Sequence, residues 1–219
     1  MDVVVDGKFI LEQRDVSLKW KGSTNQRVVD VEKIIRSRQC GAARLGGIMK
    51  RIAKFHKVSE EQFLEGWKDA FPGTEEATIK SIYENIKLPK RATAGSAGYD
   101  FFSPVDFELK PGETLKMPTG IRAEMELGWV LKIYPRSGLG FKYRLQLNNT
   151  VGIIDSDYFY SDNEGHIFIK ITNDSNEGKT VNVAAGTGFA QGIFLEYGIT
   201  EDDDATAVRN GGLGSTTKK

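Results

Sequence analysis

Residues 152–158, GIIDSDY, combine strand-forming residues with two carboxylates and a tyrosine. Ile153 and Ile154 favour a strand, and Asp155 interrupts the apolar pattern directly after them. A carboxylate at the end of a strand can take a proton from a water molecule, so Asp155 is the candidate general base of this chain. Asp and Ser are also common in surface turns, and a solvated turn is the alternative interpretation of this stretch alone.

Four further polar segments interrupt the apolar pattern of the second half of the chain. They are residues 94–100 (AGSAGYD), 135–140 (PRSGLG), 188–191 (GFAQ) and 209–216 (RNGGLGST). In the second segment, the guanidinium of Arg136 and the hydroxyl of Ser137 follow a predicted strand, and exposed amides are expected near Gly138 and Gly140. Such a compact group of donors predicts a cradle for phosphate oxygens, with a β-turn and a solvated arginine as the alternative.

Two glycine-rich patterns match nucleotide-binding loops only superficially. Residues 211–216 lack the lysine that directly precedes the hydroxyl pair of a P-loop, and no helix is predicted to follow them. Residues 186–192 match a dinucleotide fingerprint in part, but their strand context argues against one. The first pattern fits better a tail whose amides and hydroxyls close over a phosphate, with an ordinary unfolded tail as the alternative.

Together with residues 149–158, these four segments resemble the five ordered motifs of the trimeric dUTPase family, whose members hydrolyse dUTP to dUMP and pyrophosphate. The resemblance covers residues 86–219. It implies a mainly β fold, an antiparallel β-sandwich of the jelly-roll type, and a homotrimer whose subunits share active sites. It also implies dUTP as the substrate, Mg²⁺ as the cofactor, and a role in keeping uracil out of DNA and supplying dUMP for thymidylate synthesis.

The resemblance implies a role for each matching residue. Asp155 is the implied general base, and Asp100 is implied to hold Mg²⁺ through a bound water, which suits a cation that keeps part of its hydration shell. Tyr158 is implied to pack under the deoxyribose, and Asn149 to offer a donor and an acceptor to the uracil edge. The other implied substrate-binding residues are Arg136, Ser137, Gly138, Gln191, Arg209, Leu213, Gly214, Ser215 and Thr216.

Three departures from the family pattern change what is expected of the site. Gly188 stands where the fourth motif usually carries an arginine, so one cationic contact is missing. Leu213 stands where a phenylalanine usually stacks on uracil, and weaker substrate capture is predicted because stacking of a base on an aromatic ring contributes about 1–3 kcal/mol. Residues 159–165 replace the usual short turn after Tyr158, and the sequence assigns them no role.

Short strands separated by turns must position these segments. Strand-forming runs cover residues 114–117, 120–125, 129–134, 143–147, 166–172, 180–184 and 189–197. Pro-Gly, Pro-Thr-Gly and Ala-Gly turn signals lie between them. Many short strands at this spacing indicate an antiparallel sandwich or barrel, which we assign to residues 86–200, followed by a flexible Gly-rich arm at residues 201–219.

Residues 49–85 are predicted to form a short strand and two helices. Residues 59–62 (SEEQ) have the form of a capping box, in which the side chain of Gln62 reaches back to the amide of Ser59. Thr74 is the expected N-cap of the second helix. The aromatic and aliphatic residues at helical spacing are expected to pack rather than to function.

Residues 1–48 form an N-terminal extension of uncertain status. The Asp-Gly pair at residues 6–7 predicts a hairpin between residues 3–5 and 9–11. The spacing of apolar residues at 28–35 predicts a helix. A small packed appendage is the simplest interpretation.

A second interpretation is that residues 1–48 are translated from sequence upstream of a true start codon at Met49. The codons of Gly46 and Gly47 would then belong to a purine-rich ribosome-binding stretch. N-terminal sequencing of the native protein tests this hypothesis, and a first residue at Met1 would remove it.

The composition excludes several classes of protein. Lys plus Arg and Asp plus Glu both number 30, so no direct binding to nucleic acid is expected. The single cysteine, Cys40, excludes a disulfide framework within the chain. His56 and His166 are the only histidines and are expected at the surface or in strands rather than in a zinc site. No long apolar run or signal-peptide pattern occurs, which predicts a soluble cytoplasmic protein without membrane contact.

Two other functions remain open from the sequence. A dCTP deaminase of the same fold, or a bifunctional deaminase and dUTPase, is the nearest enzymatic alternative, although Tyr158 and residues 136–140 match the hydrolase better. A nucleotide-gated regulator that binds a protein partner is the alternative from another class. Retention of both Asp100 and Asp155 favours turnover.

Overall fold

The computed structural model describes residues 3–6, 27–30 and 50–211, and the chain divides into two compact units, Met1–Arg51 and Ile52–Lys219. In the first unit, strand β1 (Val3–Asp6) pairs antiparallel with β2 (Arg27–Asp30). The helix predicted over residues 28–35 is therefore wrong at its start, because β-branched residues of that run form a strand.

The predicted hairpin partner of β1 is also replaced. Val3 to Asp6 are paired with residues of β2, whereas the predicted partner, residues 9–11, lies outside the described residues. Met49 and the segment before it lie outside them as well. The hypothesis of a start codon at Met49 stays a prediction.

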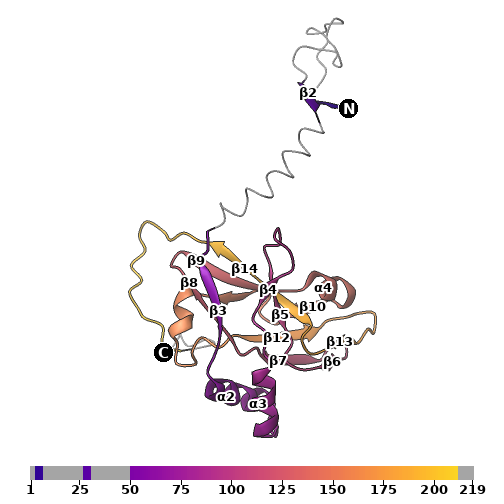
Figure 1. Cartoon of the computed structure of the whole chain (residues 1–219), viewed down its shortest axis with the longest axis vertical. Helices are drawn as coiled ribbons and strands as arrows, with labels where there is room; N and C mark the ends of the chain where they lie inside the picture. The colour runs from indigo at the N-terminus through magenta and orange to yellow at the C-terminus, as the bar shows by residue number, and fades with distance from the viewer. Residues whose placement is uncertain (1–2, 7–26, 31–49, 212–219) are drawn as a thin grey trace, which may run out of the picture. The chain divides into compact units, whose positions relative to one another are not determined.

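The second unit consists mainly of antiparallel strands, which confirms the predicted fold class (Figure 1). A five-stranded sheet has the order β11-β9-β14-β5-β4, and a three-stranded sheet has the order β10-β12-β7. The pairs β13-β6 and β3-β8 complete the strands of residues 50–211. The strands are β3 (Ala53–Lys57), β4 (Lys90–Arg91), β5 (Tyr99–Phe102), β6 (Phe107–Leu109), β7 (Thr114–Pro118), β8 (Ile121–Met125), β9 (Trp129–Pro135), β10 (Leu145–Leu147), β11 (Gly152–Ile154), β12 (Phe168–Asn173), β13 (Val181–Val183) and β14 (Gly188–Glu196).

The core lies between these sheets and follows from alternation along the strands. In β12, Ile169 and Ile171 are buried while Lys170 between them is exposed, as expected for a strand with one buried face. Leu131 and Ile133 of β9 are likewise buried. The two inner faces thus supply the apolar area whose burial stabilises the fold.

One predicted strand begins too early, because its first residue belongs to a helix. The strand predicted over residues 143–147 is limited to β10, because helix α4 (Ser137–Tyr143) precedes it. Arg144 ends this helix in the left-handed region, with φ of 53°. Two glycines within residues 137–143 disfavour a helix, so propensity could not have indicated α4.

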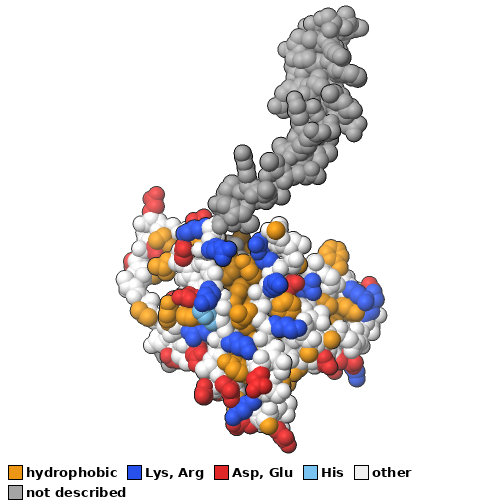
Figure 2. Space-filling view, viewed as in Figure 1, with side chains coloured by type: hydrophobic (Ala, Val, Ile, Leu, Met, Phe, Trp, Pro, Cys, Tyr) orange, Lys and Arg blue, Asp and Glu red, His pale blue; other side chains and the backbone are white. Residues whose placement is uncertain are grey.

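The predicted helices are α2 (Glu60–Ala70) and α3 (Glu76–Glu84), and both belong to the same compact unit as the sheets. Phe63 and Trp67 of α2 and Ile79 of α3 are buried in the common core. The outer faces of the helices carry carboxylates, which gather at the lower end of the molecule in Figure 2. A functional boundary at residue 85 stays a prediction.

The N-terminal caps of both helices differ from those that the sequence predicts. Ser59 caps α2 and accepts from the amide of Gln62, but its own amide donates to the carboxylate of Glu164 and not to the Gln62 side chain. The N-cap of α3 is Glu75, whereas Thr74 donates to the carbonyl of Phe71 at the end of α2. The side chain of Thr74 thus ends the first helix and does not start the second.

His166 is fully buried, which corrects the expectation of a surface or strand position. Its Nε2 accepts from the amide of Gly120 at 2.9 Å, and its ring lies 4.3 Å from the ring of Phe168. A side chain at Gly66 of α2 would lie 3.0 Å from the imidazole. Burial lowers the pKa of His166 to about 3, although the nearby Glu164 carboxylate opposes this shift.

The buried histidine predicts a loss of stability in acid. Between pH 6.5 and pH 3 the unfolded chain binds a proton at His166 that the folded chain refuses, so the free energy of unfolding falls as pH falls. From pH 7.5 to pH 5 this contribution is about 2 kcal/mol. Urea unfolding at both pH values should show His166→Gln less stable than the wild type at pH 7.5 but with a smaller pH-dependent loss. His56→Gln is the matched control, and an equal loss in wild type and His166→Gln would contradict the prediction.

Candidate active site

Three of the predicted site residues meet at one end of the five-stranded sheet. Asp100 of β5 and Gln191 of β14 are cross-strand partners, and Arg136 directly follows β9 on the other side of β14. Arg136 Nε lies 3.2 Å from Asp100 Oδ1, and the Gln191 amide donates to the carbonyl of Pro135 at 3.1 Å. The fold therefore places a cation, a carboxylate and an amide side by side; we call these three residues the Arg136 cluster.

The Arg136 cluster also accounts for the glycine at position 188. Arg136 Nη1 donates to the carbonyl of Gly188 at 3.3 Å. A Cβ atom at Gly188 would lie 3.1 Å from that nitrogen and 3.2 Å from the Cβ of Asp100. A Cβ atom at this position would require Arg136 and Asp100 to shift by a few tenths of an ångström, so a glycine fits their close approach.

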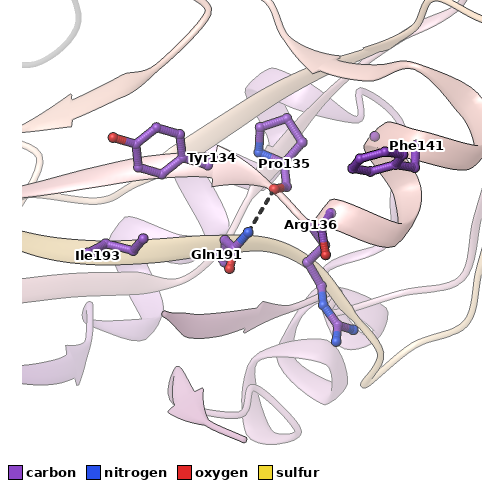
Figure 3. Close-up of a pocket in the computed structure, with 8 residues that line it drawn as sticks. Tyr134, Pro135, Arg136, Phe141, Gln191 and Ile193 are labelled. Atoms are coloured by element: carbon purple, nitrogen blue, oxygen red, sulfur yellow. Dashed lines mark hydrogen bonds between the residues drawn. The ribbon is translucent and has the colours of Figure 1, made fainter. Parts of the chain in front are cut away.

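A wide cavity of about 630 Å³ lies beside the cluster (Figure 3). Ser137 and Phe141 of α4 line it together with Gln191 and Ile193 of β14. Phe141 is 94% exposed and projects from α4 at the rim in Figure 3. An open cavity with a guanidinium, a hydroxyl and an amide on its wall can receive a phosphorylated ligand.

The predicted phosphate cradle has fewer free hydrogen-bond donors than the sequence suggested. The amides of Leu139 and Gly140 both donate to the carbonyl of Arg136, so the amide of Gly140 is not available to a ligand. Ser137 and Gly138 belong to the first turn of α4, where amides have no acceptor within the helix. The donors left for an anion are these two amides, the exposed Ser137 hydroxyl and Arg136.

The second group of site residues surrounds Asp155, which lies between β11 and the 3-10 helix η3 (Ser156–Tyr160). Arg209 of the C-terminal arm forms an ion pair with Asp155 and a second one with Asp157 at 2.9 Å. The Arg209 guanidinium lies 5.9 Å from the centre of the Tyr158 ring. Asp157 was not among the predicted site residues; the two acids that flank Ser156 were the only sequence signal for it.

Tyr158 is held by the scaffold through its hydroxyl group. The hydroxyl donates to the carbonyl of His166 at 2.8 Å and accepts from the side-chain amide of Asn163 at 2.9 Å. The residue is 6% exposed, and burial raises its pKa. The position of the ring is therefore fixed before any ligand binds.

Asn149 lies in a third place, on the wall of a cavity of about 300 Å³. It is exposed, and the neighbouring wall consists of Ile153 and Ile154 of β11 together with Lys170 of β12. The combination of an amide with aliphatic side chains suits a small planar ring with polar edges.

Strand register shows that the two ends of the site lie far apart within one chain. Ile154 pairs with Leu131, so Asp155 lies near the start of β9, whereas Arg136 follows its end. Arg136 lies five positions after Leu131 along the extended chain, which corresponds to roughly 17 Å. One chain therefore does not bring Asp155 next to the Arg136 cluster. Leu213, Gly214, Ser215 and Thr216 lie outside the described residues.

Residues 3–6, 27–30 and 50–211 provide neither a cage of side chains for a metal ion nor a membrane-spanning helix. No group of three or more His, Cys, Asp or Glu side chains there could hold a metal ion. No helix in these ranges is long and apolar enough to cross a membrane. A metal at Asp100 would therefore need ligands other than a cage of protein side chains.

The first residues of the chain are similar to an iron-sulfur family but lack its cysteine ligands. A family described as "4Fe-4S single cluster domain" matches residues 1–29. Iron-sulfur clusters are held mainly by cysteine thiolates, and these residues contain no cysteine. The match therefore does not supply the ligands of a cluster.

Comparison with known proteins identifies the larger part of the chain. The dUTPase family matches residues 84–217. The deoxyuridine 5'-triphosphate nucleotidohydrolase of Lactococcus lactis is 40% identical over 143 residues, covering 63% of this chain and 94% of that protein. The same enzyme of Dictyoglomus turgidum is 40% identical over 147 residues, covering 63% and 95%. A dUTPase mutant from phage phi11 of S. aureus shares the fold, with a TM-score of 0.50 and 20% identity over 72% of this chain and 98% of that one. The chain belongs to the dUTPase family.

Proposed function

We propose that this protein hydrolyses dUTP to dUMP and pyrophosphate. The observation that carries the proposal is the match to relatives named deoxyuridine 5'-triphosphate nucleotidohydrolase, which spans more than nine-tenths of their length. The Arg136 cluster supports it, because a dUTPase must hold three charged phosphate groups. The reaction supplies dUMP and removes dUTP, which is the precursor of uracil in DNA.

Asp155 acts as the general base in this proposal. It deprotonates the water that attacks the triphosphate, and the leaving group is pyrophosphate. Its carboxylate is paired with Arg209 and is therefore held in one orientation. When Arg209 instead turns to a phosphate oxygen, the base becomes free to accept a proton. The arm that carries Arg209, with Leu213, Gly214, Ser215 and Thr216 beyond it, then closes the site and excludes water.

The uridine half of the substrate fits the smaller cavity. Asn149 offers an amide to the uracil edge, and the aliphatic wall next to it accepts the flat ring. The buried ring of Tyr158, held through its hydroxyl, packs under the deoxyribose and leaves no space for a 2′-hydroxyl. Arg136, Ser137, Gly138 and Gln191 bind the phosphates.

The residues fit a magnesium ion that is shared with the substrate. Mg²⁺ keeps several waters and is commonly bound by one or two carboxylates together with phosphates, and Asp100 is a carboxylate at the cluster where we place the phosphates. The phage phi11 dUTPase coordinates a structural Mg(II) ion, which supports a magnesium site in the family. When bound, the ion neutralises phosphate charge that develops during hydrolysis.

The separation of the two groups supports a homotrimer with shared sites. Asp155 and Arg136 lie at opposite ends of β9, roughly 17 Å apart, which is too far for both to contact the same triphosphate from one chain. A neighbouring copy that supplies Asp155 to the Arg136 cluster solves this geometry. The site is thus completed between subunits.

Incubation with two nucleotides tests the proposed function. We expect the full chain with Mg²⁺ to release pyrophosphate from dUTP and no ammonia from dCTP. Chelation of the metal with EDTA should lower the rate by at least about tenfold, because phosphoryl chemistry depends mainly on charge stabilisation. Ammonia release from dCTP would instead support the deaminase, and unchanged turnover in EDTA would contradict the role of Mg²⁺.

A further inference from the structure

The loop of residues 159–165, which replaces a short turn of the family, connects the candidate base to helix α2. At its start, Tyr158 donates its amide to the carbonyl of Asp155 at 3.2 Å. At its end, Glu164 holds the first residue of the helical segment: the amide of Ser59 donates to Glu164 Oε2 at 2.8 Å, and its hydroxyl donates to Oε1 at 2.5 Å. One carboxylate therefore satisfies the amide of the α2 N-cap across 105 residues of sequence.

A third contact fixes the same carboxylate to the sheet. Arg122 of β8 lies with Nη1 3.5 Å from Glu164 Oε2, and its Nη2 donates to the carbonyl of Phe159. Its guanidinium also covers the Phe159 ring at 3.7 Å. Arg122 thus holds both ends of the 159–165 loop, while Glu164 joins that loop to α2.

Within the loop, hydrogen bonds lead from Glu164 directly back to Tyr158. The amide of Glu164 donates to the carbonyl of Ser161 at 2.7 Å, and the hydroxyl of Ser161 donates to the carbonyl of Tyr158. Asn163 bonds the Tyr158 hydroxyl, as described above. At Gly165 a Cβ atom would lie 2.6 Å from the Tyr158 carbonyl oxygen, so the loop is closed tightly on this residue.

The backbone of Glu164 adopts a conformation that is unfavourable for a residue with a side chain. Its φ is 56°, in the left-handed region that residues other than glycine adopt at a cost. Burial alone would raise the pKa of Glu164, but the hydrogen bonds from Ser59 and the charge of Arg122 outweigh it and the pKa is lowered. The three contacts of the carboxylate with Ser59 and Arg122 contribute against the cost of this conformation.

We propose that Glu164 is a positioning residue of the reaction, which ties α2 and Arg122 to the 159–165 loop and thereby holds Asp155 and Tyr158 in place. The helices α2 and α3 then act as a brace for the candidate base, anchored in the core by Phe63, Trp67 and Ile79. The inference rests on the proposed function, since it concerns the residue that we assign as the base of dUTP hydrolysis.

Kinetics of Glu164→Gln at 25 °C test this role, with circular dichroism to confirm that the variant is folded. Glutamine keeps the length of the side chain but loses the charge and one acceptor. We expect kcat for dUTP to fall about tenfold, because small displacements of a catalytic group are costly, while KM changes less than about threefold. Glu76→Gln, which breaks exposed ion pairs of Glu76 with Lys68 and Lys80, is the matched control and should keep the wild-type kcat.

Amide hydrogen exchange gives a second readout that does not depend on activity. In Glu164→Gln, residues 155–160 should exchange at least about fivefold faster than in the wild type, whereas in Glu76→Gln they should not change. The double variant Ser59→Ala with Glu164→Gln should lose less kcat than the two single losses combined, because the hydrogen bond between the Ser59 hydroxyl and Glu164 is counted in both single variants.

The outcomes separate the two proposals. Wild-type kcat and unchanged exchange in Glu164→Gln would overturn the positioning role while the proposed function stands. A wild-type protein that does not hydrolyse dUTP would overturn the proposed function, and exchange at residues 155–160 would still decide whether Glu164 holds this segment. A stability loss in Glu164→Gln with wild-type kcat and KM would assign Glu164 to folding alone and also overturn the inference.

Discussion

Replacing Asp155 with asparagine is expected to lower kcat for dUTP by about 10²–10⁴-fold, the range that a positioned general base contributes. Asparagine keeps the size of the side chain but cannot accept the proton of the attacking water. The pair with Arg209 also loses its charge, although one oxygen can still accept a hydrogen bond. Pyrophosphate release at saturating dUTP measures the loss, and the affinity for a non-hydrolysable dUTP analogue should change less than about threefold.

Asp157→Asn is the matched control for this experiment. Asp157 lies two residues further along, carries the same charge and also contacts Arg209, but it is exposed at the surface of η3. Its substitution weakens one of two contacts to the arm and should lower kcat less than about tenfold, since exposed ion pairs contribute little. Equal losses in the two variants would indicate that the acids act only by holding Arg209, and the assignment of the base would then be wrong.

The parts of the fold that could be predicted from the sequence are those decided by local pattern. Strand-forming runs between turn signals, such as residues 166–172, indicated strands, and the Ser59 cap with the apolar stripe after it indicated α2. Helix α4 and strand β5 were not predicted, because local pattern does not decide their conformation. Glycines in α4 and the short run Tyr99–Phe102 give weak local signals, and their conformation is set by packing against neighbouring strands.

The candidate site shows the same division. Asp100, Arg136 and Gln191 could be named from sequence segments, and the register of β5, β14 and β9 brings them together. Glu164 and His166 could not be named, because their partners Ser59 and Gly120 are 105 and 46 residues away. Periodicity carries no information on such contacts, since they depend on the order of strands in space.

Mixing two inactive variants is expected to restore activity if subunits share sites. Arg136→Ala removes the guanidinium of the phosphate cradle, and Asp155→Asn removes the base, so each homotrimer alone should be close to background. In a mixed trimer, an Asp155→Asn chain still supplies Arg136, and an Arg136→Ala chain still supplies Asp155. A site between two such neighbours, in this order around the ring, is intact. With equal amounts and random assembly in a closed ring, about one quarter of sites meet this condition.

Co-expression of the two variants with different affinity tags provides the mixed trimers, and tandem purification removes the homotrimers. Because every mixed trimer then contains one intact site of three, recovery of about one third of the wild-type rate would place Arg136 and Asp155 of one site on different chains. If both residues acted from the same chain, every site in every mixed trimer would lack one of them, and the rate would stay at background. The roughly 17 Å along β9 between the two ends of the site makes the first result the expected one.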